Sequence, residues 1–391
     1  MPPKGASLFL LLGGCASHQS TPNTQLISNT AANEHSEPEE REPIDVSEQV
    51  AAVRAEFGVP ALSIALIHDD HITHWGADGE RAMGSGVPVT LDDQWHLGSN
   101  TKSITAFLVA VLIDEGILRW DTTVAEVFAD NGPAEGWEDV SILELLRHRS
   151  GIAELGNQEM MFLYTIDDTP ANLRTRWVER MVLPNPPDPS KDYRYTNAGY
   201  MLAGAMLERL TGETWEDLMQ QHVFDALGMP DAGFGAPGPD QPLGHRETAD
   251  GSWSEVAPGP AADNPPALGP AGTVHTNHTS WTPYLAAQLD IAQGREGPFT
   301  GEVFAVLHQP SEDHPYAGGW LISDELEGIP GPILAHQGSN TMWLSTVFVL
   351  PSQNAAFICN TNAYANESTE GCVRLLTELL DIPSETRSEN D

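Results

Sequence analysis

Lysine is scarce in this sequence. Of 391 residues, only Lys4, Lys102 and Lys191 are lysines, and Lys plus Arg total 18 against 56 Asp plus Glu, a formal net charge of -38. So acidic a surface repels nucleic acid and anionic lipid headgroups, and we expect neither as a partner. The acidic residues are spread along the chain, which is typical of a solvated acidic shell; steering of cationic ligands is the alternative.

Cysteine is as rare as lysine. Cys15 lies near the N-terminus, whereas Cys359 and Cys372 lie near the C-terminus. Two cysteines do not make a disulfide framework, and a chain of 391 residues with 40% apolar residues buries a sizeable core without one. Free thiols are therefore the default interpretation, and a Cys359–Cys372 pair is the alternative if the protein is exported.

The apolar run near the N-terminus is short. Residues 6–12 follow Lys4, are too few to cross a bilayer as a helix, and lead into Leu12-Gly13-Gly14-Cys15. This pattern predicts a signal peptide over residues 1–14. Its last four residues resemble the lipobox of bacterial lipoproteins, which implies a lipid anchor on Cys15 and a place in the bacterial cell envelope. A plain signal peptide is the alternative, and both predict export.

Polar composition marks the two ends of the chain. Residues 15–43 are rich in Ser, Thr, Asn, Glu and Pro and contain few apolar residues. Such a segment cannot bury a core, so we expect a disordered tether there and a disordered tail over residues 383–391. The folded domain is expected over residues 44–382.

Periodicity within that domain predicts strands near both ends and helices between them. Strands are expected at 60–67, 72–76, 320–322, 342–350 and 355–359, and helices at 46–57, 99–115 and 372–380. Residues 100–290 form helical patches broken by Pro and Gly loops, with an irregular stretch at 234–270. The pattern predicts an α/β (α+β) fold: an antiparallel sheet built from both chain ends, flanked by helices, with an inserted, mainly helical lobe.

Ser99 and Lys102 form the first chemical candidate. Residues three apart on a helix share a face, so these two side chains can meet. A serine hydroxyl needs an adjacent base, and a lysine buried among apolar groups loses its proton more easily. The N–H groups at the start of the helix also point to where an oxyanion would form. A capping serine followed by a solvated lysine is the alternative, but Lys102 leads into a nearly all-apolar helix, which explains a solvated lysine poorly.

Two weaker patterns follow. In Tyr195-Thr196-Asn197 the phenol can relay a proton and the amide can orient a substrate. In His336-Gln337-Gly338-Ser339 the glycine permits a substrate backbone to approach closely, and an exposed N–H can be a second oxyanion donor. Tyr364-Ala365-Asn366 and His74-Trp75-Gly76 repeat the short forms, so each pattern by itself is also an ordinary polar turn.

Taken in order, these three elements resemble one group of serine hydrolases. Ser99-x-x-Lys102, Tyr195-x-Asn197 and His336-x-Gly338 are similar to motifs of the class C β-lactamases, DD-peptidases and family VIII esterases. The resemblance covers about residues 44–382 and includes further stretches in the style of that group, at residues 96–103, 145–152, 195–200 and 224–229. Motif order and spacing exclude Tyr364 and His74 as members.

The resemblance implies a role for each matched residue. Ser99 attacks the substrate carbonyl and forms an acyl-enzyme, while Lys102 and Tyr195 take and return its proton. Asn197 holds the acyl-side amide of the substrate, and the backbone N–H groups of Ser99 and Ser339 form the oxyanion hole. Water then releases the acid. The substrate-binding residues are expected to be Asn197, His336, Gln337 and Gly338.

The third motif departs from that of the β-lactamases in this group. They carry Lys-Thr-Gly or a close variant where this chain has His336, Gln337 and Gly338. There the lysine and the hydroxyl help to hold the carboxylate of the drug, whereas here a titratable imidazole and a neutral amide take their places. DD-peptidases, D-amino-acid amidases and esterases of the group commonly carry His. We therefore expect an exported serine hydrolase acting on esters or on D-amino-acid peptides and amides. A true β-lactamase and a catalytically silent member that binds peptidoglycan or a partner are the alternatives.

Neither a metal nor a cofactor is expected. His68, His71 and His74 are spaced three apart, but they fall at a predicted hairpin turn, where this spacing does not put side chains on one face. The sequence holds no His-Glu-x-x-His or paired-Cys pattern, and no Gly-rich nucleotide loop follows a strand. The expected partner is a small-molecule or peptide substrate.

Overall fold

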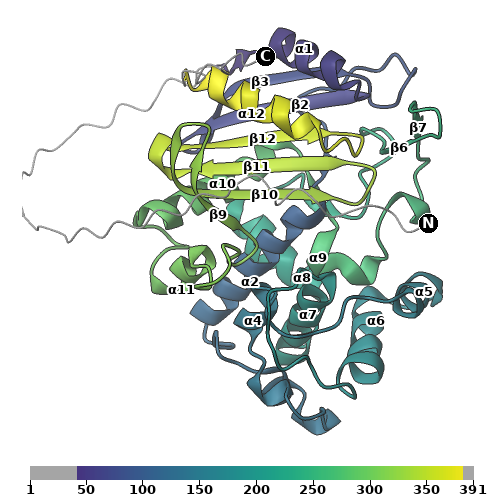
Figure 1. The fold of residues 1–391 in the computed structure, drawn as a ribbon, viewed down its shortest axis with the longest axis vertical. Helices are drawn as coiled ribbons and strands as arrows, with labels where there is room; N and C mark the ends of the chain where they lie inside the picture. Colours follow the sequence, from purple (N-terminus) through teal and green to yellow (C-terminus); the bar gives the residue numbers. More distant parts are fainter. Residues whose placement is uncertain (1–41, 382–391) are drawn as a thin grey trace, which may run out of the picture. The chain divides into compact units, whose positions relative to one another are not determined.

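A computed structural model describes residues 42–381 (Figure 1). The predicted signal peptide, the lipid anchor on Cys15, nearly all of the predicted tether and the predicted tail lie outside the described residues. Contacts divide the chain into Met1–Glu42 and Pro43–Asp391, and the fold below is that of the second unit. None of the helices in residues 42–381 is long and apolar enough to cross a membrane.

The main sheet joins the two ends of the described chain. Its seven strands lie in the order β1 (Ile44–Asp45), β3 (His71–Gly79), β2 (Ala61–His68), β12 (Ala355–Thr361), β11 (Leu344–Leu350), β10 (Ile329–Ser339) and β9 (Leu321–Leu326). Neighbouring strands are antiparallel except for β1, which pairs parallel with β3. The predicted fold class is confirmed, and the short parallel strand is the one departure from it.

Helices cover both faces of this sheet (Figure 1). On one face, α1 (Ser47–Phe57) and α12 (Ser368–Leu379) pack side by side, and their buried residues, such as Val50 and Leu376, form a core with sheet residues such as Phe357. On the other face, α10 (His278–Gln293) packs against β11 and β12. We call these the α12 face and the α10 face. Strands alternate side chains between the two faces, so each sheet residue belongs to one core or the other.

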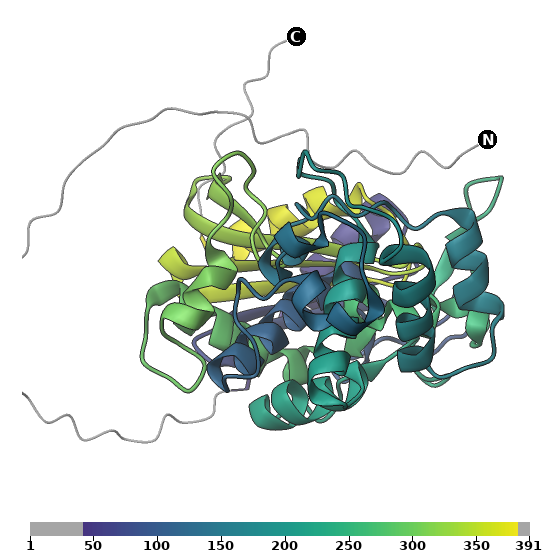
Figure 2. The same cartoon turned by 90° about the horizontal axis from the view of Figure 1, so that it is seen from below.

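A mainly helical lobe is inserted between the two sets of strands, and it lies in front of the sheet in Figure 2, which is seen from below. Its helices and those that follow it are α2 (Thr101–Asp114), α3 (Val124–Val127), α4 (Ile142–Leu146), α5 (Asn157–Thr165), α6 (Pro170–Trp177), α7 (Asn197–Thr211), α8 (Trp215–Met219), α9 (Gly269–Gly272) and α11 (Glu302–Ala305). Short strands accompany it: β4 (Trp95–His96), β8 (Val274–Thr276) and β5 (Gly233–Phe234) form one small sheet, and β6 (His245–Glu247) and β7 (Trp253–Glu255) form a hairpin. That hairpin lies inside the stretch 234–270, which the sequence predicted to be irregular.

Helix α2 occupies the middle of the lobe. All residues from Thr101 to Leu112 are buried, as the nearly all-apolar sequence predicted. Each large apolar side chain removed from water contributes about 1.5–3 kcal/mol, so a helix that is apolar all round is stable only in such a position. The consequence for function is that Lys102, in the first turn, is held inside the protein with its side chain fully buried.

Strand β10 was not predicted from the sequence. Its first residues include Pro330, Gly331 and Pro332, which are poor strand formers, and the ladder with β9 is irregular between Pro330 and Ile333. The strand becomes regular only at its second half, where it pairs with β11 from Leu334 to Ser339. This regular half is the part that contacts the turn containing Ser99.

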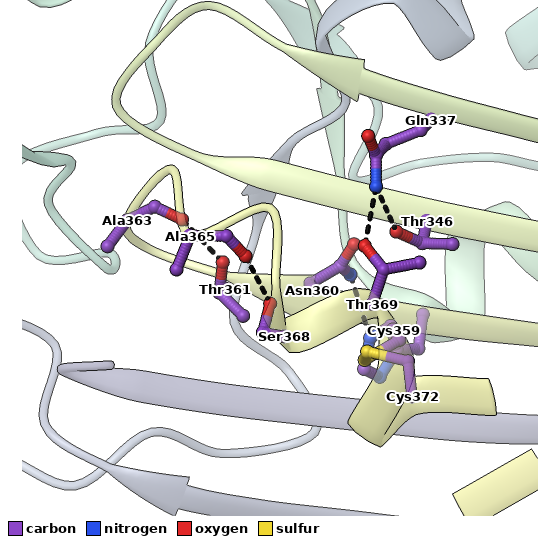
Figure 3. The surroundings of a disulfide bond; sticks show 11 residues. Gln337, Thr346, Cys359, Asn360, Thr361, Ala363, Ala365, Ser368, Thr369 and Cys372 are labelled. Atoms are coloured by element: carbon purple, nitrogen blue, oxygen red, sulfur yellow. Dashed lines mark hydrogen bonds between the residues drawn. A yellow bond between two sulfur atoms is a disulfide. The ribbon is translucent and has the colours of Figure 1, made fainter. Parts of the chain in front are cut away.

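A disulfide joins the sheet to α12. Cys359 on β12 and Cys372 on α12 are bonded, with Cα atoms 6.1 Å apart (Figure 3). The default interpretation of free thiols was therefore wrong. The sequence could not decide it, because the pairing depends on α12 packing across β12, which brings residues 13 apart into contact.

We expect the double variant Cys359→Ser/Cys372→Ser to lose about 3 kcal/mol of unfolding free energy, because the bond closes a short loop and restricts the unfolded chain. Urea unfolding of the oxidised protein, the reduced protein and the variant measures this loss. The link lies on the α12 face, so the folded variant should keep the chemistry of Ser99. Identical urea midpoints for oxidised and reduced protein would show that the bond contributes nothing.

Candidate active site

Ser99 lies in a tight turn that leads into α2. The turn is η1 (Gly98–Asn100), and Gly98 adopts a left-handed conformation with φ 52°, which favours glycine. A Cβ atom at Gly98 would lie 2.2 Å from the backbone nitrogen of Ser339, and one at Gly338 would lie 2.6 Å from the backbone nitrogen of Ser99. Two glycines therefore let the turn and β10 approach closely. The sequence analysis expected Gly338 to permit the close approach of a substrate backbone. In the structure, it is the turn containing Ser99 that approaches Gly338 closely.

The close approach brings two backbone amides to one place. Ser339 ends β10 next to the turn, and its hydroxyl donates to the carbonyl of Trp343 at 2.5 Å, which fixes the end of the strand. Ser99 is half-buried at the start of α2. The N–H groups of Ser99 and Ser339 thus lie on the two segments that meet at the nucleophile, as an oxyanion hole requires.

Lys102 meets Ser99 as the spacing predicted. Its Nζ lies 3.0 Å from Ser99 Oγ, 2.8 Å from Asn197 Oδ1 and 2.7 Å from the carbonyl oxygen of Ala271. A neutral amine has two hydrogens and one lone pair. Asn197 and Ala271 offer only oxygen acceptors, so they take the two hydrogens. The lone pair is then directed at the Ser99 hydroxyl.

Burial prepares Lys102 to act as a base. Removal of the ammonium from water lowers its pKa to about 7, while the negative charge of Glu154 opposes this and raises it. At neutral pH a large fraction of the amine is therefore unprotonated. Such a lysine can accept the proton of Ser99, which an exposed lysine cannot do.

Tyr195 lies beside the same two groups. Its ring centroid is 4.9 Å from Lys102 Nζ, and its phenol is close enough to the Ser99 side chain for that hydroxyl to affect its pKa. Burial raises the pKa of Tyr195, and the Ser99 hydroxyl only partly opposes this. The phenol therefore stays protonated, so it can donate or relay a proton but is not the free base. Of the two residues, Lys102 is therefore the one that can offer a free base near pH 7.

Asn197 begins α7 and points into the site. Thr196 caps this helix by accepting from the N–H of Ala198 at 3.1 Å, which sets the direction of the first turn. Because Asn197 Oδ1 accepts from Lys102, the NH2 group of the same amide remains available as a donor. The position fits the predicted contact with a carbonyl on the acyl side of a substrate.

His336 is present at the site but does not supply a cation. Its Nδ1 lies 3.0 Å from Asn100 Oδ1, so Nδ1 carries the proton, and its Nε2 accepts from the Tyr316 hydroxyl at 3.2 Å. Burial, together with the nearby Lys102, lowers the pKa of His336 to about 3. The imidazole is neutral near pH 7. The sequence treated His336 as a titratable cation in place of the family's lysine, and the structure corrects this.

Gln337 is not brought to Ser99. Its Nε2 donates to Thr369 Oγ1 at 2.6 Å and to Thr346 Oγ1 at 3.3 Å, and Thr369 belongs to α12 (Figure 3). Gln337 therefore points to the α12 face, whereas His336 and Gly338 point to the other face. The expected substrate contact of Gln337 is corrected: its amide ties β10 to α12.

Sequence reasoning missed several residues around the site. The ring of His148 is buried and lies 4.3 Å from the ring of Tyr195 and 4.7 Å from that of Tyr316. Burial and the charge of Lys102 lower the pKa of His148 well below its ordinary value, so it too is neutral. Its place in the family-like stretch 145–152 was the one available signal. Tyr316 had none, because it follows a loop with no recognisable pattern.

Glu154 is the acid whose charge acts on this chemistry. It is exposed and acts electrostatically on both Lys102 and Tyr195. Burial of part of its surface raises the pKa of its carboxyl group, and Thr196 and Lys102 oppose this. The charge of Glu154 is thus linked to the protonation of Lys102.

The pH profile of hydrolysis should report these two groups. Because the neutral amine is the reactive form, kcat/KM should rise with pH through an apparent pKa near 7, the value that burial gives Lys102. Glu154→Gln removes a charge that favours the ammonium form, so this limb should move to lower pH. Glu325→Gln is the matched control. Glu325 lies on β9 and pairs with Pro330, at the end of β10 opposite to Ser339, so this variant should leave the pH of the limb unchanged. A shift to higher pH in Glu154→Gln would contradict the assignment.

No metal-binding cluster accompanies the site in the described part of the chain: no three His, Cys, Asp or Glu side chains gather there in a way that could hold an ion. The groups that do converge are a serine, a buried lysine, a phenol and backbone N–H donors. These are the parts of an acyl-transfer site. The fold and the site together define a serine hydrolase with a Ser-x-x-Lys centre.

The chain belongs to the β-lactamase-related family of serine hydrolases, since the Beta-lactamase family model matches residues 46–379. Penicillin-binding protein 4 of Amycolatopsis lactamdurans is 28% identical over 357 residues, which are 86% of this chain and 90% of that protein. A lovastatin esterase of Penicillium rubens is 30% identical over 193 residues, 44% of this chain and 48% of that protein.

Solved structures agree with the fold. The octameric penicillin-binding protein homologue from Pyrococcus abyssi superposes with a TM-score of 0.70 at 22% identity, covering 87% of this chain and 77% of that chain. The relatives include, besides the lovastatin esterase, a protein named as a putative D-alanyl-D-alanine carboxypeptidase of Escherichia coli, and a D-stereospecific amidohydrolase of Streptomyces has the same fold. This protein is accordingly a hydrolase related to the serine β-lactamases.

Proposed function

We propose that this protein hydrolyses esters, or amides and peptides of D-amino acids, through an acyl-enzyme on Ser99. The observation that carries the proposal is the placement of Lys102. Its Nζ lies 3.0 Å from Ser99 Oγ, its two hydrogens have fixed acceptors, and its pKa is about 7. A buried lysine with this arrangement is otherwise a costly feature that serves no packing purpose.

The geometry supports a reaction in two halves, the acylation of Ser99 and the hydrolysis of the acyl-enzyme. Ser99 Oγ attacks the substrate carbonyl while its proton passes to Lys102, and the N–H groups of Ser99 and Ser339 stabilise the negative oxygen. The proton then passes through the Tyr195 hydroxyl to the leaving alcohol or amine, and the acyl group remains on Ser99. Water attacks this ester in the second half while Lys102 takes a proton from the water; the bond between Ser99 Oγ and the acyl group breaks, the proton returns to Oγ, and the acid is released.

Substrate preference follows from two residues of β10. The neutral His336 offers no positive charge to a carboxylate, and the Gln337 amide is directed to the α12 face. Both features argue against a β-lactam, whose carboxylate needs such partners. They favour esters and uncharged D-amino-acid amides over substrates that carry a carboxylate on the leaving side. The net charge of -38 acts in the same direction, because it repels anions.

One panel of substrates tests the proposal: p-nitrophenyl acetate and butyrate, D-alanine amide, a D-Ala-D-Ala peptide and nitrocefin, assayed on one preparation. Ser99→Ala provides the background. We expect the ester or the D-amide to be turned over fastest. Faster turnover of nitrocefin would identify a true β-lactamase, and the absence of Ser99-dependent turnover on every substrate would favour a silent, binding member of the family.

We further propose that the protein is exported and held in the cell envelope by a lipid on Cys15. The lipobox-like sequence before Cys15 and the Cys359–Cys372 disulfide support this, because disulfides persist in oxidising compartments. Expression with labelled palmitate and membrane fractionation test it. Wild type should carry the label in the membrane fraction and Cys15→Ser should not; an unlabelled wild-type protein in the cytoplasm would overturn this proposal.

A further inference from the structure

Asp263 lies in the stretch 234–270, which the sequence predicted to be irregular and expected to help shape the cleft. Its Oδ1 lies 2.8 Å from Nε2 of His96, an imidazole on β4 that is fully buried. On the other edge of the same ring, Nδ1 accepts a hydrogen bond from the backbone N–H of Gly98 at 3.0 Å. Because Nδ1 is an acceptor, the ring proton is on Nε2, the nitrogen that lies beside the carboxylate. One imidazole thus connects Asp263 to the residue before Ser99.

The same carboxylate reaches the other side of the candidate oxyanion hole. Asn340 Nδ2 donates to Asp263 Oδ1 at 3.0 Å, and Asn340 directly follows Ser339. The ring of His96 also stacks on Trp343, with centroids 5.6 Å apart, and the carbonyl of Trp343 accepts the hydroxyl of Ser339. Both segments that carry the proposed oxyanion donors are therefore fixed to this pair.

A third connection leads toward the base. Asn264 follows Asp263, and its Nδ2 donates to the carbonyl of Gly272 at 3.1 Å. The preceding carbonyl, that of Ala271, is one of the two acceptors that orient Lys102. Two consecutive residues, Asp263 and Asn264, thus lie beside the turn before Ser99, the segment after Ser339 and the segment that supports Lys102.

We propose that His96 and Asp263 are positioning residues for acyl transfer. The pair holds the Gly98–Ser99 turn and the Ser339–Asn340 segment at the separation that a developing oxyanion requires. Oxyanion donors act only when they are fixed within a few tenths of an ångström of their working positions, and backbone amides can be fixed only through their neighbours. Trp95 and Leu97 on either side of His96 are packed in the core, so this network is rigid. This inference rests on the proposed acyl-enzyme chemistry of Ser99.

Isosteric variants test the pair without changing the packed volume. Asp263→Asn removes the carboxylate charge that lies beside His96 Nε2. His96→Asn places its side-chain oxygen near the position of Nδ1 and can keep the Gly98 contact, whereas His96→Gln places its amide near Nε2 and can keep only the Asp263 contact. His278→Asn is the matched control: this imidazole is equally buried, but it lies on α10 and bonds to Asn360.

We expect Asp263→Asn to lower kcat for a p-nitrophenyl ester by about tenfold to a hundredfold with little change in KM, the size of effect that a misplaced catalytic group produces. Affinity for a boronic acid that forms an adduct with Ser99 should fall by the same factor, because the adduct uses the oxyanion hole. His96→Asn should retain more activity than His96→Gln. His278→Asn should lose thermal stability but keep kcat.

Three results would overturn the inference: an unchanged kcat in Asp263→Asn, a loss of kcat in His278→Asn as large as in Asp263→Asn, or a boronic acid affinity that does not follow kcat/KM. The wild-type protein and Ser99→Ala are assayed in the same series. If wild type shows no Ser99-dependent turnover, the proposed function itself fails; if it does and Asp263→Asn matches it, only the role of the pair fails.

Discussion

Replacement of Lys102 by alanine should lower kcat by at least about a hundredfold at neutral pH, because it removes the base from Ser99. The variant leaves Asn197 Oδ1 and the Ala271 carbonyl without their shared donor and opens a space between them. A small primary amine can enter that space and present its lone pair to Ser99. We therefore expect millimolar methylamine to restore part of the lost activity in Lys102→Ala and none in Ser99→Ala.

Lys191→Ala is the matched control for this experiment. Lys191 is a lysine of the described chain that is partly exposed and pairs with Glu144 at 2.7 Å, away from the nucleophile. Its removal should leave kcat unchanged. Since a buried lysine has been deleted, thermal unfolding of Lys102→Ala must show that the variant is folded. A folded Lys102→Ala protein with near wild-type turnover would refute the role of this residue as base.

Tyr195→Phe should also lose at least about a hundredfold in turnover on substrates with poor leaving groups. The hydroxyl stays protonated and lies beside the Ser99 side chain, which places it to donate a proton to the departing alcohol or amine. A p-nitrophenolate leaves without protonation, so the loss should be much smaller for a p-nitrophenyl ester than for an alkyl ester or an amide. Parallel kinetics on the three leaving groups measures this difference.

Two further readouts separate this role from simple packing. Tyr193 is a neighbouring tyrosine whose ring stacks on His314. Tyr193→Phe removes its hydroxyl and should leave the dependence of the rate on the leaving group unchanged. The acid limb of the pH profile should stay near 7 in Tyr195→Phe, because Lys102 keeps its burial and its acceptors. An equal loss for all three leaving groups would contradict proton transfer through Tyr195.

The sequence could predict the parts of the site that depend on local geometry. Ser99 and Lys102 meet because they are three positions apart at the start of a helix, and the apolar residues that follow are a sufficient signal that Lys102 is buried. The roles of Tyr195 and Asn197 were predicted from the resemblance to a family, and in the structure both residues contact Lys102. The fold class was predicted from the same two sources, local patterning and resemblance.

The remainder depends on contacts between distant segments, which leave no local pattern. His336 looks like a cation in the sequence, and only its burial against Tyr316 and Asn100 makes it neutral. Gln337 points away from the site because side chains alternate between the two faces along β10. The sequence did not predict this orientation, because the proline-rich first half of β10 conceals the strand. The carbonyl of Ala271 offers no sequence signal at all, since any residue has one.

The central claim is that Ser99 forms a covalent acyl-enzyme with Lys102 as its base. The most direct measurement is labelling with a fluorophosphonate at pH 6 and pH 8, followed by mass spectrometry of the labelled peptide. We predict one adduct on Ser99 that forms faster at pH 8, and almost none in Lys102→Ala. An adduct on another residue, or a Ser99 adduct whose rate is the same at both pH values and in Lys102→Ala, would contradict the account.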